Sequence, residues 1–154
     1  MFASRRALVL IAALTALSAC SDSDPADVED GVTIEDFVGS WTASSHTYTN
    51  NADASETFDL IANGGETRTT ILTGGAGRTW VEFGTFSDEW DAQLSISGNT
   101  VTTVPAEASR ETRVFTFTLV GTVMTLTDAS SSFDFTLMDA AGVSATEVIV
   151  FVKQ

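Results

Sequence analysis

The sequence predicts an all-β protein: a single antiparallel up-and-down β-barrel of about eight to ten strands, which follows a signal peptide and a disordered acidic tether. Three observations lead to this fold class. Thr, a β-branched residue that favours strands, occurs 21 times between residues 42 and 146. Apolar and polar residues alternate with a period of two, as they do over residues 114–119. Short turn segments join the runs, which is typical of antiparallel neighbours, and 154 residues suffice for one domain.

The first element, residues 1–19, has the pattern of a secretory signal peptide. A basic start with Arg5 and Arg6 precedes an apolar run too short to span a bilayer, which needs roughly 20 residues. The run ends in Leu-Ser-Ala-Cys at 17–20, which resembles the lipobox of bacterial lipoproteins. This resemblance implies cleavage before Cys20 and attachment of lipid, such as palmitate, to Cys20. Because Ser21 and not Asp follows, it also implies an outer-membrane anchor facing the periplasm. The alternative is an ordinary signal peptide with a chance Cys.

The second element is the linker at 20–33, whose acidic residues repel one another and whose apolar side chains are too few to join a core. A calcium site at Asp22, Asp24 and Asp27 is the alternative, but the EF-hand spacing is absent. The chain has a formal charge of −14, and the part after cleavage holds five basic and 21 acidic residues, 5 − 21 = −16. So acidic a chain is not expected to bind nucleic acid.

The third element is the barrel domain at 34–154. It is expected to open with one helical turn at 34–38 and to continue as strands near 40–49, 56–63, 66–73, 78–86, 92–97, 100–104, 111–120, 122–128, 132–138 and 145–153. Turns are predicted at Asn63-Gly64-Gly65, as a tight hairpin, and at 74–77 and 97–100. Pro105 ends one strand and Gly121 separates two others. The last run, 148–152, is apolar on both faces, as expected of a strand that is covered on each side or that closes a barrel.

The entry to this domain, Phe37-Val38-Gly39-Ser40-Trp41, resembles the Gly-x-Trp motif that opens the first strand of lipocalins and related calycins. Looser matches follow at 58–65, 84–102 and 115–128, so that the resemblance to a lipocalin-like barrel covers about residues 36–153. It implies that Gly39 permits a close backbone approach and that Trp41 plugs the closed end of the barrel. In lipocalins an Arg near the last strand stacks on this Trp, and Lys153 stands near that place here. The disulfide common in secreted lipocalins is absent, because Cys20 is the only Cys.

The sequence offers little chemistry for catalysis, and no enzyme, cofactor or metal site is predicted. One Cys and one His exclude a Cys/His zinc site. His46 has the strand parity opposite to Trp41 and is therefore expected to point outward into solvent. The acidic segment Asp88 to Asp91 is expected to be a solvated loop anchored by Trp90; a glycosidase pair or a cation site is the alternative.

The barrel interior is the remaining candidate site. A barrel of eight strands is just wide enough to be filled by side chains or to hold one small ligand. The predicted inward face carries apolar candidates for lining such a ligand: Phe58, Leu60, Phe115, Phe117, Met124, Leu126, Phe133, Phe135 and Leu137. These side chains suit either a packed core or an apolar ligand. The sequence therefore suggests a membrane-anchored envelope lipoprotein that binds a small apolar ligand or is a non-catalytic envelope component. The alternative is a protein-interaction module, such as an inhibitor or assembly partner, with a solid barrel and an acidic binding surface.

Overall fold

The computed structural model describes residues 31–137 and 141–154, so the predicted signal peptide, Cys20 and most of the tether lie outside the described residues. The described chain begins with one turn of 3-10 helix, η1 (Ile34–Phe37), which confirms the predicted helical turn. Strands make up most of the remaining described residues, and no further helix occurs among them. Their bounds are β1 (Gly39–Asn50), β2 (Thr57–Asp59), β3 (Glu66–Ile71), β4 (Ala76–Phe83), β5 (Phe86–Ser97), β6 (Thr100–Pro105), β7 (Arg113–Val120), β8 (Val123–Phe133) and β9 (Val143–Lys153).

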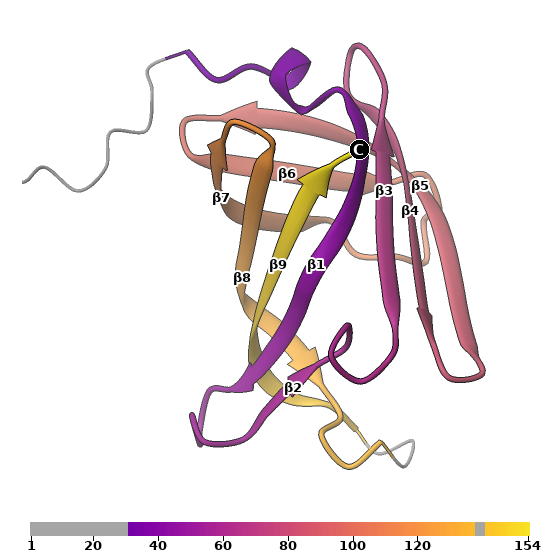
Figure 1. The fold of residues 1–154 in the computed structure, drawn as a ribbon, viewed down its shortest axis with the longest axis vertical. Helices are drawn as coiled ribbons and strands as arrows, with labels where there is room; N and C mark the ends of the chain where they lie inside the picture. Colours follow the sequence, from indigo (N-terminus) through magenta and orange to yellow (C-terminus); the bar gives the residue numbers. More distant parts are fainter. Residues whose placement is uncertain (1–30, 138–140) are drawn as a thin grey trace, which may run out of the picture.

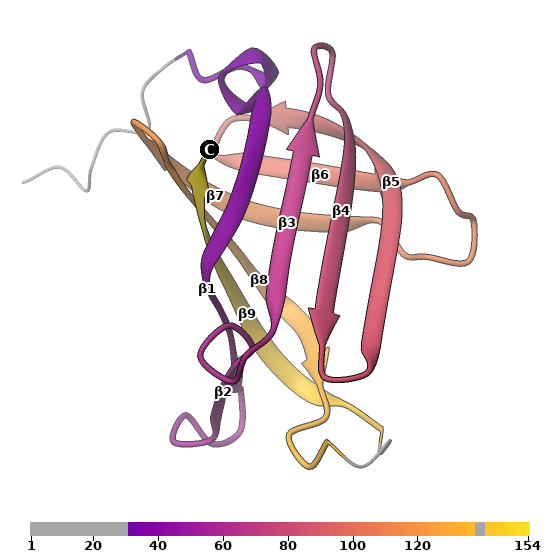
Figure 2. The ribbon, with the colours of Figure 1, turned by 45° about the vertical axis from the view of Figure 1, so that its right-hand side comes forward.

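Eight strands close into an antiparallel barrel, which confirms the predicted fold class (Figure 1). The strands from β3 to β9 pair in sequence order, and both β3 and β9 pair with β1. The β1–β9 ladder runs from Trp41 opposite Lys153 to Asn50 opposite Ala145, so the last apolar strand closes the barrel as predicted. Figure 2 shows β3, β4 and β5 side by side, with the β4–β5 turn at the end opposite η1. We call the end beside η1 the closed end and the other the far end.

The predicted hairpin at Asn63-Gly64-Gly65 is wrong in one respect. The chain does turn there, with Gly64 at a φ of 87°, a conformation that favours glycine. However, β2 and β3 do not pair with each other, because both lie on the same edge of β1. β1 is 12 residues long and β3 only six, so the edge of β1 has room for a second short strand beyond β3.

Three predicted strands differ most from the structure. The strand expected at 56–63 ends at Asp59, and residues 60–64 form a turn. The strand expected at 92–97 begins at Phe86, so the acidic segment around Asp88 is part of β5 and not a loop. The strand expected at 132–138 is not a separate element: β8 continues to Phe133, with a bulge between Asp128 and Ser131, and the chain then turns. Leu137 has a φ of 55°, a left-handed conformation incompatible with a regular strand.

A bulge in β1 overturns the prediction that His46 points outward. Trp41 and Ala43 are buried on the inner face, but the β1–β9 register shifts between Ala43 and Ser45. Ser44 is therefore an additional residue in β1, and every residue after it changes face. His46 is consequently directed inward and only 3% exposed.

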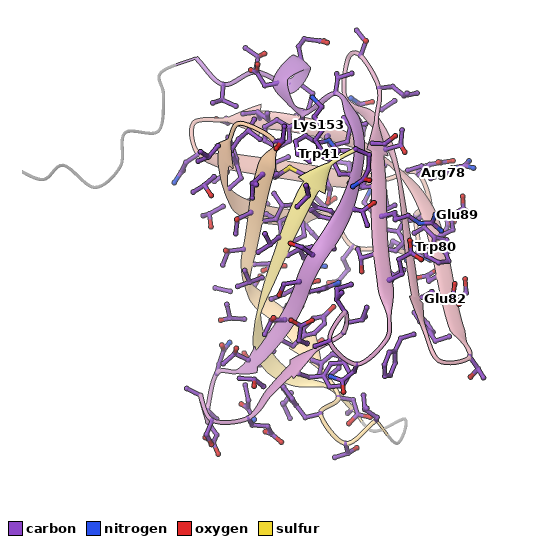
Figure 3. All side chains as sticks on the ribbon, viewed as in Figure 1. Trp41, Arg78, Trp80, Glu82, Glu89 and Lys153 are labelled. Atoms are coloured by element: carbon purple, nitrogen blue, oxygen red, sulfur yellow. The ribbon has the colours of Figure 1, made fainter. Side chains whose placement is uncertain are left out.

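The closed end is packed around Trp41. Trp41 is 1% exposed, and its indole Nε1 donates a hydrogen bond of 2.8 Å to the carbonyl of Phe37 in η1. The ammonium of Lys153 lies 5.2 Å from the centre of the indole ring, and Figure 3 shows the two side chains together. Gly39 has a φ of 143°, and a Cβ added there would lie 2.6 Å from Cε of Lys153. These contacts close one end of the barrel with a solid apolar core.

Candidate functional site

The nine candidate ligand-lining residues do not share one face. Phe115, Phe117, Met124 and Leu126 are buried in the core. Leu60 is buried in the turn after β2. Phe58, Phe133 and Phe135 are half-buried, and Leu137 is 51% exposed in the turn after β8. Part of the predicted lining is therefore core, and only three aromatic residues remain as candidates.

These three belong to an aromatic cluster towards the far end, the far-end rings, made of Tyr48, Phe58, Phe83, Phe133 and Phe135. The ring of Tyr48 stacks on Phe133 with centroids 4.2 Å apart, and Phe58 stacks on the same ring at 5.1 Å. Phe83 meets Phe58 edge-on at 5.4 Å, and Phe135 meets Phe133 edge-on at 5.0 Å. The cluster joins β1, β2, β4 and the end of β8 and is only partly buried, which leaves apolar surface for a ligand.

Beside these rings the barrel interior holds hydrogen-bonded polar and charged residues, which we call the interior network: His46, Thr67, Arg113, Asp128 and Glu147. Glu147 is 2% exposed and accepts from His46 Nε2 at 2.6 Å. It also accepts from the hydroxyls of Tyr48 and Ser131 at 3.0 and 3.1 Å and from Arg113 Nη2. Arg113 Nη2 also lies 2.6 Å from Asp128, and His46 Nδ1 lies 2.9 Å from the hydroxyl of Thr67.

The contacts in and beside the network shift the pKa values of Glu147, Tyr48 and Arg113. Burial by itself raises the pKa of Glu147, but the hydrogen bond from His46 and the charge of Arg113 outweigh it and lower this pKa to about 2. Burial beside the Glu147 carboxylate raises the pKa of Tyr48. Burial works against the charge of Arg113, yet its two carboxylate partners raise its pKa. Glu147 is therefore ionised and accepts, so His46 Nε2 carries the donated proton.

Sequence reasoning missed this network, although a signal was present. Glu147 alternates with Ala145, Ile149 and Phe151 on the inner face of β9. A charged residue at an inward position of an apolar strand is a recognisable exception to the period-two pattern. The bulge in β1, by contrast, leaves no plain mark in the sequence, so the partner His46 was not predictable.

The wall formed by β4 and β5 keeps its inner face in contact with solvent. Thr79 and Val81 lie opposite the buried Thr69 and Thr67, so their side chains share the inner face, and Trp90 lies opposite Thr79. Thr79, Val81 and Trp90 are nevertheless only half-buried. The Arg113 side chain is 34% exposed, although it too faces inward with Phe115 and Phe117. The interior beside the network is therefore reached by water.

The reason is the uneven length of the strands. β6 pairs with β5 over residues 92–97, and just beyond it the Ala106 N–H donates to the Asp91 carbonyl. Within the described chain, residues 86–90 of β5 therefore pair with β4 alone. The segment between β6 and β7 lies near this unpaired edge, because Arg110 binds Asp88 at 2.5 and 3.0 Å. The guanidinium of Arg110 also lies 4.9 Å from the centre of the Trp90 ring. The side chains of the acidic segment therefore alternate in direction along β5. Asp88 and Trp90 face inward, and Glu89 and Asp91 face outward.

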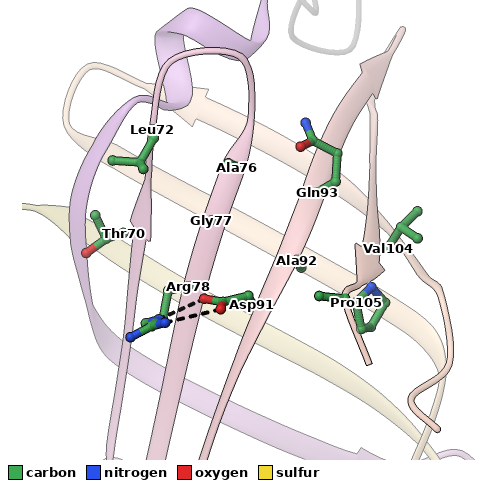
Figure 4. A pocket seen from close by; sticks show the side chains of 11 residues that line it. Thr70, Leu72, Ala76, Gly77, Arg78, Asp91, Ala92, Gln93, Val104 and Pro105 are labelled. Carbon is green, nitrogen blue, oxygen red and sulfur yellow. Dashed lines mark hydrogen bonds and ion pairs between the residues drawn. The ribbon is translucent and has the colours of Figure 1, made fainter. Parts of the chain in front are cut away.

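The outer face of β3, β4 and β5 carries a charged ladder (Figure 3). Arg78 binds Glu89 at 3.1 Å and Asp91 at 2.7 Å, and Arg68 lies 4.2 Å from the ring centre of Trp80. Beside Arg78 and Asp91 lies a shallow, mostly apolar groove (Figure 4). Its lining residues are Thr70, Leu72, Ala76, Gly77, Arg78, Asp91, Ala92, Gln93, Val104, Pro105 and Ala106.

The interior also holds a hydroxyl, an imidazole and a carboxylate in one series of hydrogen bonds. Thr67, His46 and Glu147 are hydrogen-bonded in series, but the Thr67 hydroxyl belongs to a residue only 1% exposed and is not reached by a substrate. No group of three metal-binding side chains occurs among the described residues. In the same part of the chain no helix is long and apolar enough to cross a membrane.

Comparisons with known proteins do not assign the chain to a family: no family model, no curated protein and no solved structure matches it.

Proposed function

We propose that the protein is a lipid-anchored envelope lipoprotein whose barrel binds a small apolar molecule beside the far-end rings and the interior network. One observation carries the binding proposal: Val81 and Trp90 face into the barrel and yet remain in contact with water. Inward-facing apolar side chains of a filled barrel are buried, as Phe117 and Met124 are at the closed end.

Binding of a ligand would be favourable because it removes this apolar surface from water. Each 100 Å² of apolar surface withdrawn from solvent contributes about 2.5 kcal/mol. Half-buried aromatic side chains supply part of this surface: Phe83, Phe133 and Phe135 among the far-end rings, and Trp90 on β5. Apolar walls with a few polar groups are typical of small-molecule sites.

The binding proposal is tested with N-phenyl-1-naphthylamine, an uncharged dye that fluoresces in apolar surroundings. The lipid-free Cys20→Ser chain is expected to raise the dye's emission in a saturable titration and to melt at a higher temperature when dye is present. Val81→Trp fills the inner face and should abolish the saturable signal. Val114→Trp makes the same change at an outward residue of β7 that is 53% exposed and should leave the signal unchanged. Equal effects of the two variants would contradict an interior site.

The anchor is supported by the lipobox-like segment at 17–20. Wild-type protein expressed in a bacterium is expected to fractionate with membranes and to gain the mass of acyl chains on Cys20. Cys20→Ser lacks the thiol that would carry an acyl chain, so it should remain in the soluble periplasmic fraction. Stable anchoring needs more than one acyl chain. Recovery of both proteins in the soluble fraction would contradict the anchor and leave the barrel's binding role untouched.

The outer groove supports a second candidate function, the docking of a protein partner. Leu72 and Val104 beside it are 58% and 47% exposed, and the Glu89 and Asp91 carboxylates nearby would attract a basic partner. A photocrosslinking amino acid at Val104 is expected to give an adduct in cells that disappears in high salt. The same group at Val114, outside the groove, should not give that adduct. Identical adducts at both positions would contradict a groove-specific partner.

A further inference from the structure

Arg113 has one guanidinium nitrogen, Nη1, whose N–H groups are not used in a hydrogen bond within the described chain. Its Nε and Nη2 donate to Asp128, and Nη2 also contacts Glu147 and Ser131. Its Nη1 has no hydrogen-bond partner among the described residues, and the side chain is 34% exposed. The guanidinium also lies 4.6 Å from the ring centre of Phe115, so the free donor is next to an apolar wall.

The charge of Arg113 does not make its surroundings positive. Asp128 and Glu147 both bind it, which gives three groups with a sum of −1. The next inward pair, Asp88 with Arg110, adds no net charge. The arginines and carboxylates of the interior therefore number two positive and three negative groups, 2 − 3 = −1. The whole chain, at −14, adds to the negative potential.

The free Nη1 donor and the negative interior together favour an uncharged ligand over an anionic one. An anion entering the barrel would lose its hydration and meet a negative interior, where charge interactions are stronger than in water. An uncharged oxygen acceptor would receive a hydrogen bond from Arg113 Nη1 without this cost. We infer that the barrel binds uncharged apolar molecules that carry a hydrogen-bond acceptor, such as esters, and discriminates against the matching carboxylates. This inference rests on the proposed interior binding site.

The test is displacement of bound N-phenyl-1-naphthylamine by methyl decanoate and by decanoate at pH 7.5. The two competitors share a ten-carbon acyl chain and differ in charge. The ester is expected to displace the dye at a concentration at least tenfold lower than the carboxylate. Equal potency, stronger displacement by decanoate, or failure of the ester to displace a dye that does bind would overturn the inference. If the dye itself does not bind saturably, the proposed binding function fails and the inference fails with it.

A matched pair of variants checks the cause of the discrimination. Asp128→Asn removes one interior negative charge and keeps a side-chain oxygen for Arg113. It should therefore reduce the preference for the ester, measured as the ratio of the decanoate and methyl decanoate concentrations that displace the dye, at least threefold. Glu82→Gln removes one charge from the exposed outward side of β4 and should leave the preference unchanged. If Asp128→Asn does not fold, the wild-type ratio still decides the inference. An equal change in both variants would show that the overall charge, and not the interior, sets the preference.

Discussion

At the residue scale, the interior depends on a single inserted residue. Ser44 in the β1 bulge turns His46 and Tyr48 towards Glu147, which a regular strand starting at Trp41 would not do. The bulge therefore brings two hydrogen-bond donors to a carboxylate that is almost completely buried. Without such donors, an ionised group at this position would be strongly destabilising.

Glu147→Gln is expected to lower the free energy of unfolding by about 3 kcal/mol at neutral pH, because it leaves Arg113 with one carboxylate partner fewer. Since the folded-state pKa of Glu147 is depressed to about 2, its contribution is present above its ordinary pKa of 4.5 and is lost as the pH falls from there towards 2. Urea unfolding at pH 7, 4 and 3 should show a smaller loss of stability in the variant. An identical loss in both proteins would contradict the role assigned to Glu147.

Gly39→Ala is expected to destabilise the barrel by about 1–2 kcal/mol, since a φ of 143° strains any residue with a side chain. A second cost comes from the contact between the new Cβ and Lys153. Thermal unfolding of Gly39→Ala, Lys153→Ala and the double variant separates the two. The double variant should recover only the contact cost, so it should remain less stable than Lys153→Ala alone. Equal stability of those two proteins would show that backbone strain is negligible.

At the element scale, the barrel could be predicted from the sequence, but the arrangement of its interior could not. Alternation in β7, β8 and β9 predicts which apolar residues face the core, because period-two patterns are a direct consequence of strand geometry. The far end was not predictable in the same way. Phe133 and Phe135 alternate like a strand, but β8 ends at Phe133 and Phe135 lies in the turn that follows. The position of Phe133 depends on packing against Tyr48 and Phe58. Bulges in β1 and β8 likewise have no plain sequence signature.

The segment between β6 and β7 should control access to the interior. Arg110 attaches it to the unpaired part of β5 through Asp88 and Trp90. Arg110→Ala is expected to accelerate hydrogen exchange of the amides at 106–112 and to increase the association rate of N-phenyl-1-naphthylamine by about threefold or more. Exchange mass spectrometry and stopped-flow fluorescence measure the two effects.

Arg78→Ala is the matched control for this prediction. Arg78 also binds an aspartate of β5 through two nitrogens, but it does so on the outer face of the barrel. Arg78→Ala should therefore change neither the hydrogen exchange of the amides at 106–112 nor the association rate of the dye. The same acceleration in both variants would mean that general loosening of β5, and not release of this segment, opens the interior.

At the scale of the whole molecule, charge is distributed unevenly between the inside and the outside of the barrel. The interior acids Asp88, Asp128 and Glu147 are all paired with arginines. Several described acids take part in no ion pair: Glu35, Asp36, Asp53, Glu56, Asp59, Glu82 and Glu111. Repulsion among surface carboxylates thus opposes the compact state, whereas the paired interior charges are shielded from salt by burial.

Salt should therefore stabilise this barrel. Screening weakens two opposing interactions: exposed ion pairs such as Arg68 with Glu66, and the repulsion of a chain with a formal charge of −14. Exposed ion pairs contribute little to stability, so the relief of repulsion is expected to dominate. The urea midpoint should rise between 20 and about 500 mM NaCl, at a pH near 7. Glu82→Gln with Glu111→Gln, which removes two exposed acids outside ion pairs, should raise the midpoint at low salt and reduce the response. A midpoint that falls with salt would mean that the exposed ion pairs outweigh the repulsion.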